Sequence, residues 1–435
     1  MERTVAVHTL GCKVNQYESA ALVRIFKEQG YREVEFSEPA DVYIINTCTV
    51  THLGDRKSRQ LIRRAAKTNP EGVIVVTGCY AQTSPGEVLA LPEVDLVVGT
   101  GDRARIVDLV EKVDKEKEAI NAVLDIEKVK VFEELPAPEG QGRVRAFLKI
   151  QEGCRNFCAY CIIPYARGPL RSRPPENVLA EARNLISKGF KEIILTGIHT
   201  GAYGVDLKDS IDLTGIIKRL VQLPGLERLR LSSVEPKDIN ADLINLMVKS
   251  SVFCNHLHIP LQSGSDRILK LMRRRYTTDE YAALLKSLRK EIPGLAVTTD
   301  VMVGFPGETE EDFIDGYNFI KEMSFSGLHV FKYSPRKGTP AADFPDQVEP
   351  QIKDDRSHRL IELGEHMALN YSKKFIGQTM TVLVEQGFPE REGYYEGLTD
   401  NYLRVVFPGE ENLRGSIITI KIEKPGIQYL EGRII

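Results

Sequence analysis

The sequence has no long apolar run. None of its hydrophobic stretches approaches the roughly 20 residues that a bilayer-spanning helix needs. The first residues, Met1 to Leu10, pass straight into a strand-like pattern without the apolar core and cleavage site of a secretory signal. We therefore expect a cytoplasmic protein with no membrane partner.

The sequence also lacks a large excess of charge of either sign. The 435 residues hold 58 Lys and Arg against 61 Asp and Glu, a net charge of −3. Any nucleic-acid contact must therefore come from a local basic patch. Three segments offer one, at 56–67, 167–173 and 273–275, although each alone is more often a solvated helix face.

Cysteine is sparse, and its placement is unusual. A reducing compartment makes a disulfide framework from the seven cysteines improbable. Six of them form two triads, a tight one at Cys154, Cys158 and Cys161 and a spread one at Cys12, Cys48 and Cys79. The seventh, Cys254, has no partner in this pattern, and we expect it to pack in a core.

The tight triad offers three thiolates and no fourth ligand. This suits a cubane iron–sulfur cluster that keeps one iron open for an outside ligand. Structural zinc normally takes four protein ligands, so zinc fits poorly, and unligated buried thiols are the other alternative. The tight triad therefore predicts an iron–sulfur site.

The first 125 residues alternate strand-like and helix-like patterns. The expected strands lie at 4–10, 41–47, 73–78 and 96–100, with helices beginning near 15, 53 and 103. Alternating βα units predict an α/β fold with a doubly wound parallel sheet. Each cysteine of the spread triad directly follows a strand, and parallel strands end at one edge, where such sheets bind ligands. The three cysteines can therefore converge on a second cluster.

A Pro/Gly-rich stretch at 126–143 is predicted to be a linker. Residues 144–371 hold six further strand patterns, near 144, 191, 227, 256, 296 and 328, with helical patterns between them. Six βα units predict a partial barrel rather than a closed eight-stranded one, with its site at the carboxyl edge. Residues 372–435 are rich in short strands and turns and predict a small antiparallel β-barrel.

Several motifs strengthen these predictions by resemblance. The segment GCRNFCAYCIIPYARG at 153–168 resembles the radical S-adenosylmethionine (SAM) superfamily, including an aromatic residue before the last cysteine. TLGCKVNQYES, INTCTVT and TGCYAQ resemble the N-terminal domain of the methylthiotransferases. RSRP, LSSVEP, HIPLQSGSDRILKLMRR and TDVMVGFPGETEEDF resemble the catalytic barrel of that family, and the tail resembles a TRAM domain. GCKVNQYES is most similar to the MtaB-type subgroup.

The resemblance implies a chemistry for both triads. The tight triad would hold a [4Fe–4S] cluster that binds SAM and cleaves it to a 5′-deoxyadenosyl radical. The spread triad would hold a second [4Fe–4S] cluster that delivers sulfur. The expected product is a methylthio group at C2 of N6-threonylcarbamoyladenosine, next to the tRNA anticodon (position 37). The implied partners are tRNA, a sulfur donor and a low-potential electron donor such as flavodoxin or ferredoxin, and the protein is expected to be a monomer.

Further site residues are expected at strand ends of the partial barrel. Candidates for SAM binding are Tyr160, Gly197, Ser232, Ser233, Glu235 and Gln262. Structural roles are the alternatives: Gly197 could be an ordinary turn glycine, the two serines could cap a helix, and Gln262 could line the barrel lumen. Arg171 and Arg173 could reach RNA phosphates or the threonylcarbamoyl carboxylate, since Arg suits bidentate contact with either.

Two other functions compete with this interpretation. A RimO-like methylthiotransferase would use the same chemistry on an aspartate of a ribosomal protein. A noncatalytic RNA-binding protein would use its iron–sulfur clusters as structural elements. Two clusters that each lack a protein ligand argue against the second alternative, because structural metal sites are normally closed.

Overall fold

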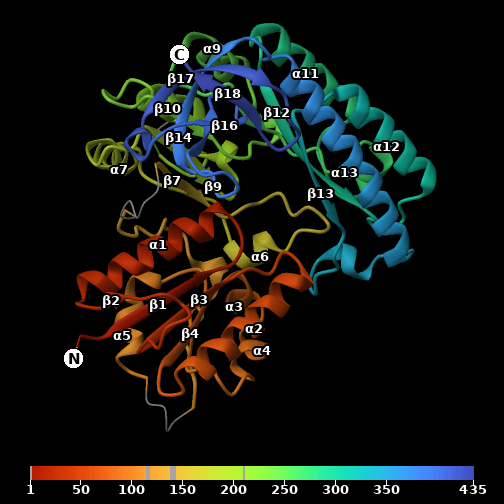
Figure 1. Cartoon of the computed structure of the whole chain (residues 1–435). Coiled ribbons are helices and arrows are strands. Elements are labelled where there is room, and N and C mark those ends of the chain that lie inside the picture. Colours follow the sequence, from red (N-terminus) through yellow and green to blue (C-terminus); the bar gives the residue numbers. More distant parts are fainter. Residues whose placement is uncertain (1, 114–117, 138–143, 209–210) are drawn as a thin grey trace.

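The computed structural model describes residues 2–113, 118–137, 144–208 and 211–435. An N-terminal α/β unit lies at one end of the molecule and a small C-terminal barrel at the other, with a larger α/β unit between them (Figure 1). No helix in the described ranges is long and apolar enough to cross a bilayer.

The N-terminal unit is built on a six-stranded parallel sheet. The strand order is β2 (Arg32–Glu33), β1 (Thr4–Thr9), β3 (Val42–Thr47), β4 (Val73–Gly78), β5 (Leu96–Val97) and β6 (Ile120–Asn121). Helices α1 (Lys13–Glu28) and α5 (Ile106–Val110) pack on one face. Helices α2 (His52–Thr68), α3 (Cys79–Thr83) and α4 (Pro85–Leu89) pack on the other. The predicted doubly wound sheet is confirmed, while the two-residue edge strands β2 and β6 were too short to be predicted.

The strand order reverses direction at one point of this sheet. The chain runs from β1 outward to β2 and then returns to the other side of β1, where β3 and β4 follow. Ligands of open α/β sheets bind where the order reverses, at the carboxyl ends of the strands. That point lies between β1 and β3, the strands that precede Cys12 and Cys48.

The central unit is a partial barrel of six parallel strands. In order these are β7 (Arg145–Glu152), β9 (Glu192–Gly197), β10 (Arg228–Leu231), β11 (His256–His258), β12 (Ala296–Val303) and β13 (Gly327–Lys332), with two single bridges joining β10 to the β11 region. The edge strand β8 (Arg171–Ser172) pairs antiparallel with β7 and was not predicted. The six predicted parallel strands are confirmed.

Helices cover the outside of this partial barrel. They are α7 (Pro175–Ser187), α8 (Leu213–Leu220), α9 (Ala241–Lys249), α11 (Thr278–Glu291), α12 (Glu310–Met323) and α13 (Pro350–Lys373), together with the shorter α10 (Asp266–Leu271). Alternate strand residues such as Leu148, Leu229 and Val301 pack against these helices in the main hydrophobic core. The residues between them face the lumen, and many of those are charged.

The C-terminal residues form a closed five-stranded barrel. Its strands are β14 (Thr379–Gly387), β15 (Tyr394–Thr399), β16 (Arg404–Pro408), β17 (Ile417–Lys424) and β18 (Leu430–Ile434). The predicted small barrel is confirmed, with one difference: β16 and β18 pair parallel, whereas the other pairs are antiparallel.

This small barrel docks on the amino ends of the central strands. Arg228 donates hydrogen bonds to the carbonyls of Leu398 and Thr381. Arg230 donates to those of Thr399 and Asp400. The small barrel therefore closes the end of the lumen that is opposite the tight triad.

The described part of the predicted linker is packed rather than free. Ile126, Phe132 and Leu135 are buried, and Glu133 pairs with Arg103 of the N-terminal unit. These apolar side chains are spaced irregularly, so no helical or strand pattern marked them as core. The remaining residues of that prediction, 138–143, lie outside the described residues.

Candidate active site

The three spread cysteines lie at the carboxyl ends of three neighbouring strands. Cys12 precedes the first residue of α1, Cys48 follows β3 directly, and Cys79 is the first residue of α3 after β4. Cys12 is exposed, Cys48 is partly buried and Cys79 is buried. The thiols lie close enough for the charges of Cys12 and Cys48 to act on Cys79.

Gly11 allows two of these loops to approach each other. Its φ of +110° is a conformation that favours glycine. A Cβ at this position would lie 3.0 Å from the Cys48 Cβ and 3.2 Å from its Sγ. A side chain here would therefore push Cys12 and Cys48 apart.

Burial disfavours the thiolate form of these cysteines in the protein alone. It raises the pKa of Cys48, and it raises the pKa of Cys79 to about 12 despite the opposing effect of Arg167. Thiolates are what iron binds, and a bound cation deprotonates a coordinating thiol. A bound metal group would therefore be needed to hold these buried side chains as thiolates.

A buried network of charges lies directly behind the spread triad. Arg167, the last residue of α6 (Ile163–Arg167), donates from Nε to the Cys79 Sγ at 3.3 Å. Its two terminal nitrogens reach Glu18 Oε1 and Asn15 Oδ1, each at 2.6 Å. Glu18 is fully buried and also pairs with Arg103 at 2.6 Å and with Lys149 at 2.8 Å. The network therefore joins the N-terminal unit to the loop that carries the tight triad.

The tight triad occupies the loop after β7. Phe157 has a φ of +46°, and the Cys161 N–H donates to the Cys158 carbonyl at 3.0 Å, so the loop is a compact turn. Ala159 fixes it to the barrel through backbone bonds of 2.9 Å to Met272 and to Ala341. Burial raises the pKa values of Cys158 and Cys161, as it does for the spread triad.

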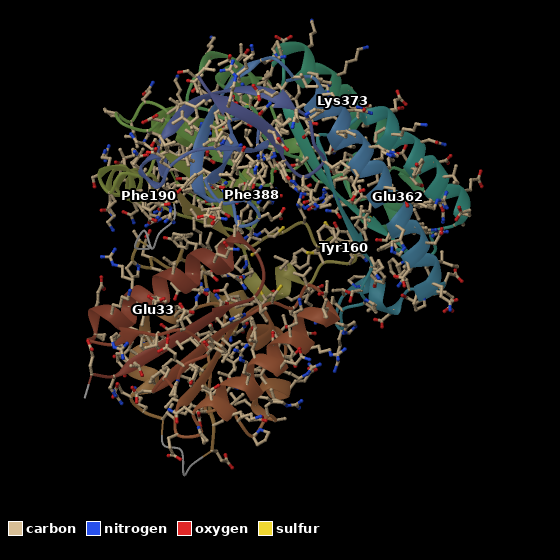
Figure 2. The ribbon with its side chains drawn as sticks, in the orientation of Figure 1. Glu33, Tyr160, Phe190, Glu362, Lys373 and Phe388 are labelled. Atoms are coloured by element: carbon tan, nitrogen blue, oxygen red, sulfur yellow. The ribbon has the colours of Figure 1, made fainter. Side chains whose placement is uncertain are left out.

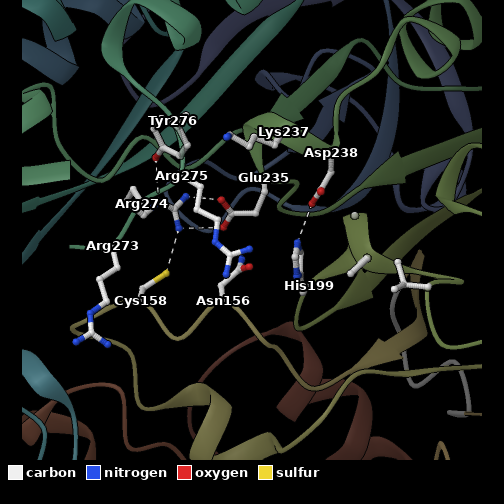
Figure 3. A pocket seen from close by; sticks show the side chains of 13 residues that line it. Asn156, Cys158, His199, Glu235, Lys237, Asp238, Arg273, Arg274, Arg275 and Tyr276 are labelled. Carbon is white, nitrogen blue, oxygen red and sulfur yellow. Dashed lines mark hydrogen bonds and ion pairs between the residues drawn. The ribbon is translucent and has the colours of Figure 1, made fainter. Parts of the chain in front are cut away.

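A cavity of about 280 Å³ opens beside this loop. Figure 3 shows the Arg274 guanidinium between the Glu235 carboxylate and the Cys158 thiol. Arg274 reaches Cys158 Sγ at 3.6 Å and Glu235 Oε1 at 3.2 Å. The cavity thus combines a cysteine of the triad with both signs of charge.

His199 faces the same cavity from the end of β9. Its Nε2 lies 2.7 Å from Asp238 Oδ2, a contact drawn in Figure 3. Burial lowers the pKa of His199, but hydrogen bonds to Asp238 and to Cys154 outweigh it and raise the pKa to about 10. Asp238 and Cys154 therefore both favour the protonated form of His199.

Three family models match this chain. Residues 4–99 match the uncharacterized protein family UPF0004, residues 148–320 the Radical SAM superfamily, and residues 373–435 the TRAM domain. The threonylcarbamoyladenosine tRNA methylthiotransferase MtaB of Bacillus subtilis (strain 168) is 52% identical over 99% of this chain and 96% of its own length. The chain belongs to the radical SAM methylthiotransferase family.

Other relatives and one solved structure agree with this placement. A tRNA-2-methylthio-N(6)-dimethylallyladenosine synthase from Moorella thermoacetica is 36% identical over 100% of this chain and 98% of its own length. The radical SAM methyltransferase TsrM from Kitasatospora setae has the same fold over 79% of this chain and 77% of its own, with a TM-score of 0.59 and 15% identity. The methylthiotransferase family implies a [4Fe–4S] cluster and SAM.

The residues of the methylthiotransferase fit an iron–sulfur group. Within the described ranges, no three Cys, His, Asp or Glu side chains close around a single ion. In a cubane each thiolate binds a different iron, so its sulfurs stand farther apart than the ligands of one ion. Two sets of three thiols, each beside an arginine, match that requirement.

The predicted SAM-binding residues are spread around the carboxyl edge of the barrel. Glu235 lines the cavity described above, next to the triad. Tyr160, labelled in Figure 2, packs edge-on against Phe305 with ring centroids 6.5 Å apart. Ser232 is buried, and its Oγ has no hydrogen-bond partner among the described residues. An unpaired buried hydroxyl is costly, so a polar ligand at this position would stabilise it.

The other three candidates for SAM binding, Ser233, Gln262 and Gly197, contact the rest of the protein mainly through their backbone atoms. Ser233 accepts a hydrogen bond from Thr200 Oγ1 at its carbonyl and leaves its side chain exposed. Gln262 has a φ of +67° and bridges to β12 through its N–H and carbonyl, each at 2.8 Å. A Cβ on Gly197 would lie 3.1 Å from Gln151, so the loop after β9 packs tightly there.

The structure differs from the expectation for Arg171 and Arg173. Both are buried, and their guanidinium groups are committed to protein partners. Arg171 donates to the carbonyls of Arg167 and Val129, while Arg173 pairs with Glu134 and Glu181. Both therefore stabilise the segment between the units, Arg171 from β8, which pairs with β7, and Arg173 from the residue after β8; their contact with RNA stays a prediction.

Sequence patterns did not assign a role at the cysteines to four charged residues, although Arg167 and Arg274 belong to the possible basic patches. Glu18, Arg167 and Arg274 meet the cysteine loops, and Lys13 follows Cys12. A partial signal existed for each, since all four lie within or beside the quoted motifs. Their roles depend on contacts between distant segments, and residue spacing carries no record of those.

Proposed function

We propose that this methylthiotransferase inserts a methylthio group at C2 of N6-threonylcarbamoyladenosine next to the anticodon of tRNA. The observation that carries the proposal is the 52% identity, over nearly the whole chain, to a relative named for that reaction. The two cysteine triads support it, since Arg167 of the tight-triad loop touches Cys79 of the spread triad. The protein is proposed to act in the cytoplasm as a monomer.

The tight triad is proposed to hold the [4Fe–4S] cluster that binds SAM. Cys154, Cys158 and Cys161 provide the thiolates, and Ser232 and Glu235 are candidates for the ribose hydroxyls and the methionine amine. When bound, the cluster and SAM supply the radical chemistry that activates an aromatic C–H bond. The residues around them orient SAM and exclude water.

The spread triad is proposed to hold a second [4Fe–4S] cluster that delivers sulfur. Cys12, Cys48 and Cys79 provide its thiolates, and Cys12 is the exposed member of the three. Arg167 stabilises the thiolate form of Cys79 by charge and by a hydrogen bond. A low-potential electron donor, such as flavodoxin or ferredoxin, and a sulfur donor are the remaining proposed partners.

The C-terminal barrel is proposed to contact the tRNA. It matches the TRAM domain, and aromatic side chains such as Tyr394 and Tyr395 are only partly buried. Exposed aromatic faces can stack on unpaired bases. Its docking to the central barrel through Arg228 and Arg230 fixes its position relative to the active site.

Nucleoside analysis tests the proposed function directly. The protein is reconstituted anaerobically with iron and sulfide, supplied with SAM and a reductant, and incubated with tRNA that carries N6-threonylcarbamoyladenosine. Mass spectrometry should find the 2-methylthio derivative, and parallel reactions should leave dimethylallyladenosine tRNA and ribosomal-protein substrates unmodified. Product on either of those substrates alone would refute the assignment.

Replacing Arg167 should weaken the second cluster selectively. In a protein with all three tight-triad cysteines changed to Ala, an added R167Q is expected to lower retained iron severalfold, because Cys79 loses its charged donor. R167K keeps the positive charge but lacks the planar guanidinium group, so it should retain an amount of iron between those of the wild type and R167Q. Iron and sulfide assays with electron paramagnetic resonance measure this, and R105Q, which alters an exposed pair with Asp102, is the control. Unchanged iron in R167Q would contradict the role.

A further inference from the structure

Lys13 carries a charge into the partial barrel from the N-terminal unit. It is the first residue of α1, directly after Cys12, and it is partly buried. Its ammonium interacts electrostatically with Asp300 on β12, with Arg145 on β7 and Arg230 on β10, and with Tyr402 of the C-terminal barrel. The strand neighbours of these residues, Ala146, Leu229 and Val301, face the outer core, so Arg145, Arg230 and Asp300 face the lumen.

Lys13 has no hydrogen bond or ion pair within the part of the chain that the structure describes. The arginines near it differ, because Arg230 pairs with Glu192 at 2.7 Å and Arg145 pairs with Glu385 at 2.5 Å. Asp300 is also engaged, with its Oδ2 3.2 Å from His258 Nε2. Lys13 therefore offers an uncommitted cation to whatever occupies the lumen.

The surrounding wall is polar and contains a second uncommitted group. His256 donates or accepts at Nε2 with Thr298 Oγ1 at 2.9 Å, and its ring stacks on Tyr402 with centroids 4.6 Å apart. Its Nδ1 has no partner in the described structure, although the residue is only 4% exposed. His329 stands edge-on to His258 at 5.6 Å and completes this side. An unpaired buried nitrogen beside an unpaired cation fits a polar, anionic ligand.

An apolar occupant would not satisfy these groups. The dimethylallyl group named for several relatives has no hydrogen-bonding atom, so it would leave Lys13 and His256 desolvated and unpaired. The threonylcarbamoyl group has a carboxylate, a hydroxyl and amide groups. Its carboxylate is the only one of these that carries the charge opposite to that of Lys13.

We propose that Lys13 binds the carboxylate of the threonylcarbamoyl group and thereby selects this nucleoside over other N6-modified adenosines. The inference rests on the proposed function and deepens it. C2 and C6 of adenine are both bonded to N1, so a base with C2 at the cysteines also holds its N6 substituent in the space beside them. The flexible stem of Lys13 starts one residue after Cys12 and reaches into that space.

Binding measurements on the protein without its clusters test the proposal. Fluorescence anisotropy compares three anticodon stem-loop RNAs at fixed salt: one with N6-threonylcarbamoyladenosine, one with its carboxylate as the methyl ester, and one with plain adenosine. We expect the wild type to prefer the free carboxylate about 10- to 100-fold, the range for one hydrogen bond to a charged group. K13Q should lose this preference, and K13R should keep most of it. The control K27Q, on the same helix but paired with Glu33, should behave as wild type.

The outcomes separate the inference from the function beneath it. If K13Q still prefers the free carboxylate as the wild type does, the role of Lys13 is wrong while the proposed reaction stands. If the reconstituted wild type forms no methylthio product on threonylcarbamoyladenosine tRNA, the proposed function itself is wrong. If K13Q unfolds at a lower temperature than the wild type, the comparison is made on the wild-type protein alone. Equal affinity of the wild type for the RNA with the free carboxylate and the RNA with the methyl ester would overturn the proposal.

Discussion

Replacing Cys48 with alanine is expected to abolish methylthiolation while leaving SAM cleavage intact. Cys48 belongs to the spread triad, which contains no residue of the loop at 154–161. Removing one of three thiolates should prevent the second cluster from assembling, so sulfur delivery stops. The reaction at the tight triad retains all its ligands. Liquid chromatography of 5′-deoxyadenosine, with mass spectrometry of tRNA nucleosides, should show the first product and at least 100-fold less of the second, a loss of roughly 3 kcal/mol in transition-state terms.

Two further variants make this test decisive. Cys158→Ala is expected to abolish both products, because it removes a ligand of the SAM-binding cluster. Cys254→Ala should preserve both, since Cys254 is buried apart from either triad beside Arg230. Methylthiolated tRNA at wild-type levels from Cys48→Ala would refute the division of labour between the triads. Loss of 5′-deoxyadenosine in the same variant would show that the two sites assemble together.

Glu18→Gln is expected to destabilise the fold more than most single substitutions. Glu18 is fully buried, and its carboxylate compensates Arg103, Arg167 and Lys149. Neutralising it leaves these three buried cations to share the carboxylates of Glu133 and Glu152, and breaking buried ion pairs in this way typically costs about 3–5 kcal/mol. The midpoint of urea unfolding should fall accordingly. The unit interface should also loosen, because Arg167 and Lys149 belong to the central unit and Glu18 to the N-terminal one.

The pH dependence of stability gives an independent measure of Glu18. Burial raises its pKa, but the adjacent Arg103, Arg167 and Lys149 outweigh this and hold the pKa well below its usual value. A lowered folded-state pKa gives stability that is complete above the unfolded value of about 4.3 and is lost as the pH falls below it. The wild type should therefore lose stability in acid more steeply than Glu18→Gln.

A matched control distinguishes burial from mere loss of charge. Glu28 lies on the same helix and pairs with Arg24 at 2.8 Å, but its side chain is 52% exposed. Exposed pairs of this kind contribute little, about 0.3–0.5 kcal/mol. Glu28→Gln should consequently unfold at nearly the wild-type urea concentration. Equal shifts for Glu18→Gln and Glu28→Gln would show that the network contributes no more than a surface pair.

The sequence was most informative where local pattern and topology coincide. The positions of Cys12, Cys48 and Cys79, each just after a strand, were enough to predict one shared sheet edge. The two-residue strands β2, β6 and β8 escaped prediction, whereas β5, which is equally short, was marked by the apolar run at 96–98. All strand pairs of the C-terminal barrel are antiparallel, as expected, except the pair β16–β18. That pair is parallel because of the way in which the barrel closes.

Charged side chains were predicted less well than cysteines. Arg171 and Arg173 looked like free cations from their sequence neighbours, but Glu134 and Glu181 face Arg173 in the fold, and backbone carbonyls surround Arg171. The partners of an arginine can come from any distance along the chain. Its exposure therefore cannot be inferred from spacing alone.

The amino-acid sequence by itself determined the three units, the two triads and the family resemblance, because strand periodicity and cysteine spacing are local properties. Only the tertiary structure showed that Arg167 joins one triad to the other, that the C-terminal barrel closes the lumen, and that Lys13 enters it unpaired. These features arise where separate segments meet. Burial there decides which charges are compensated and which remain available to a ligand.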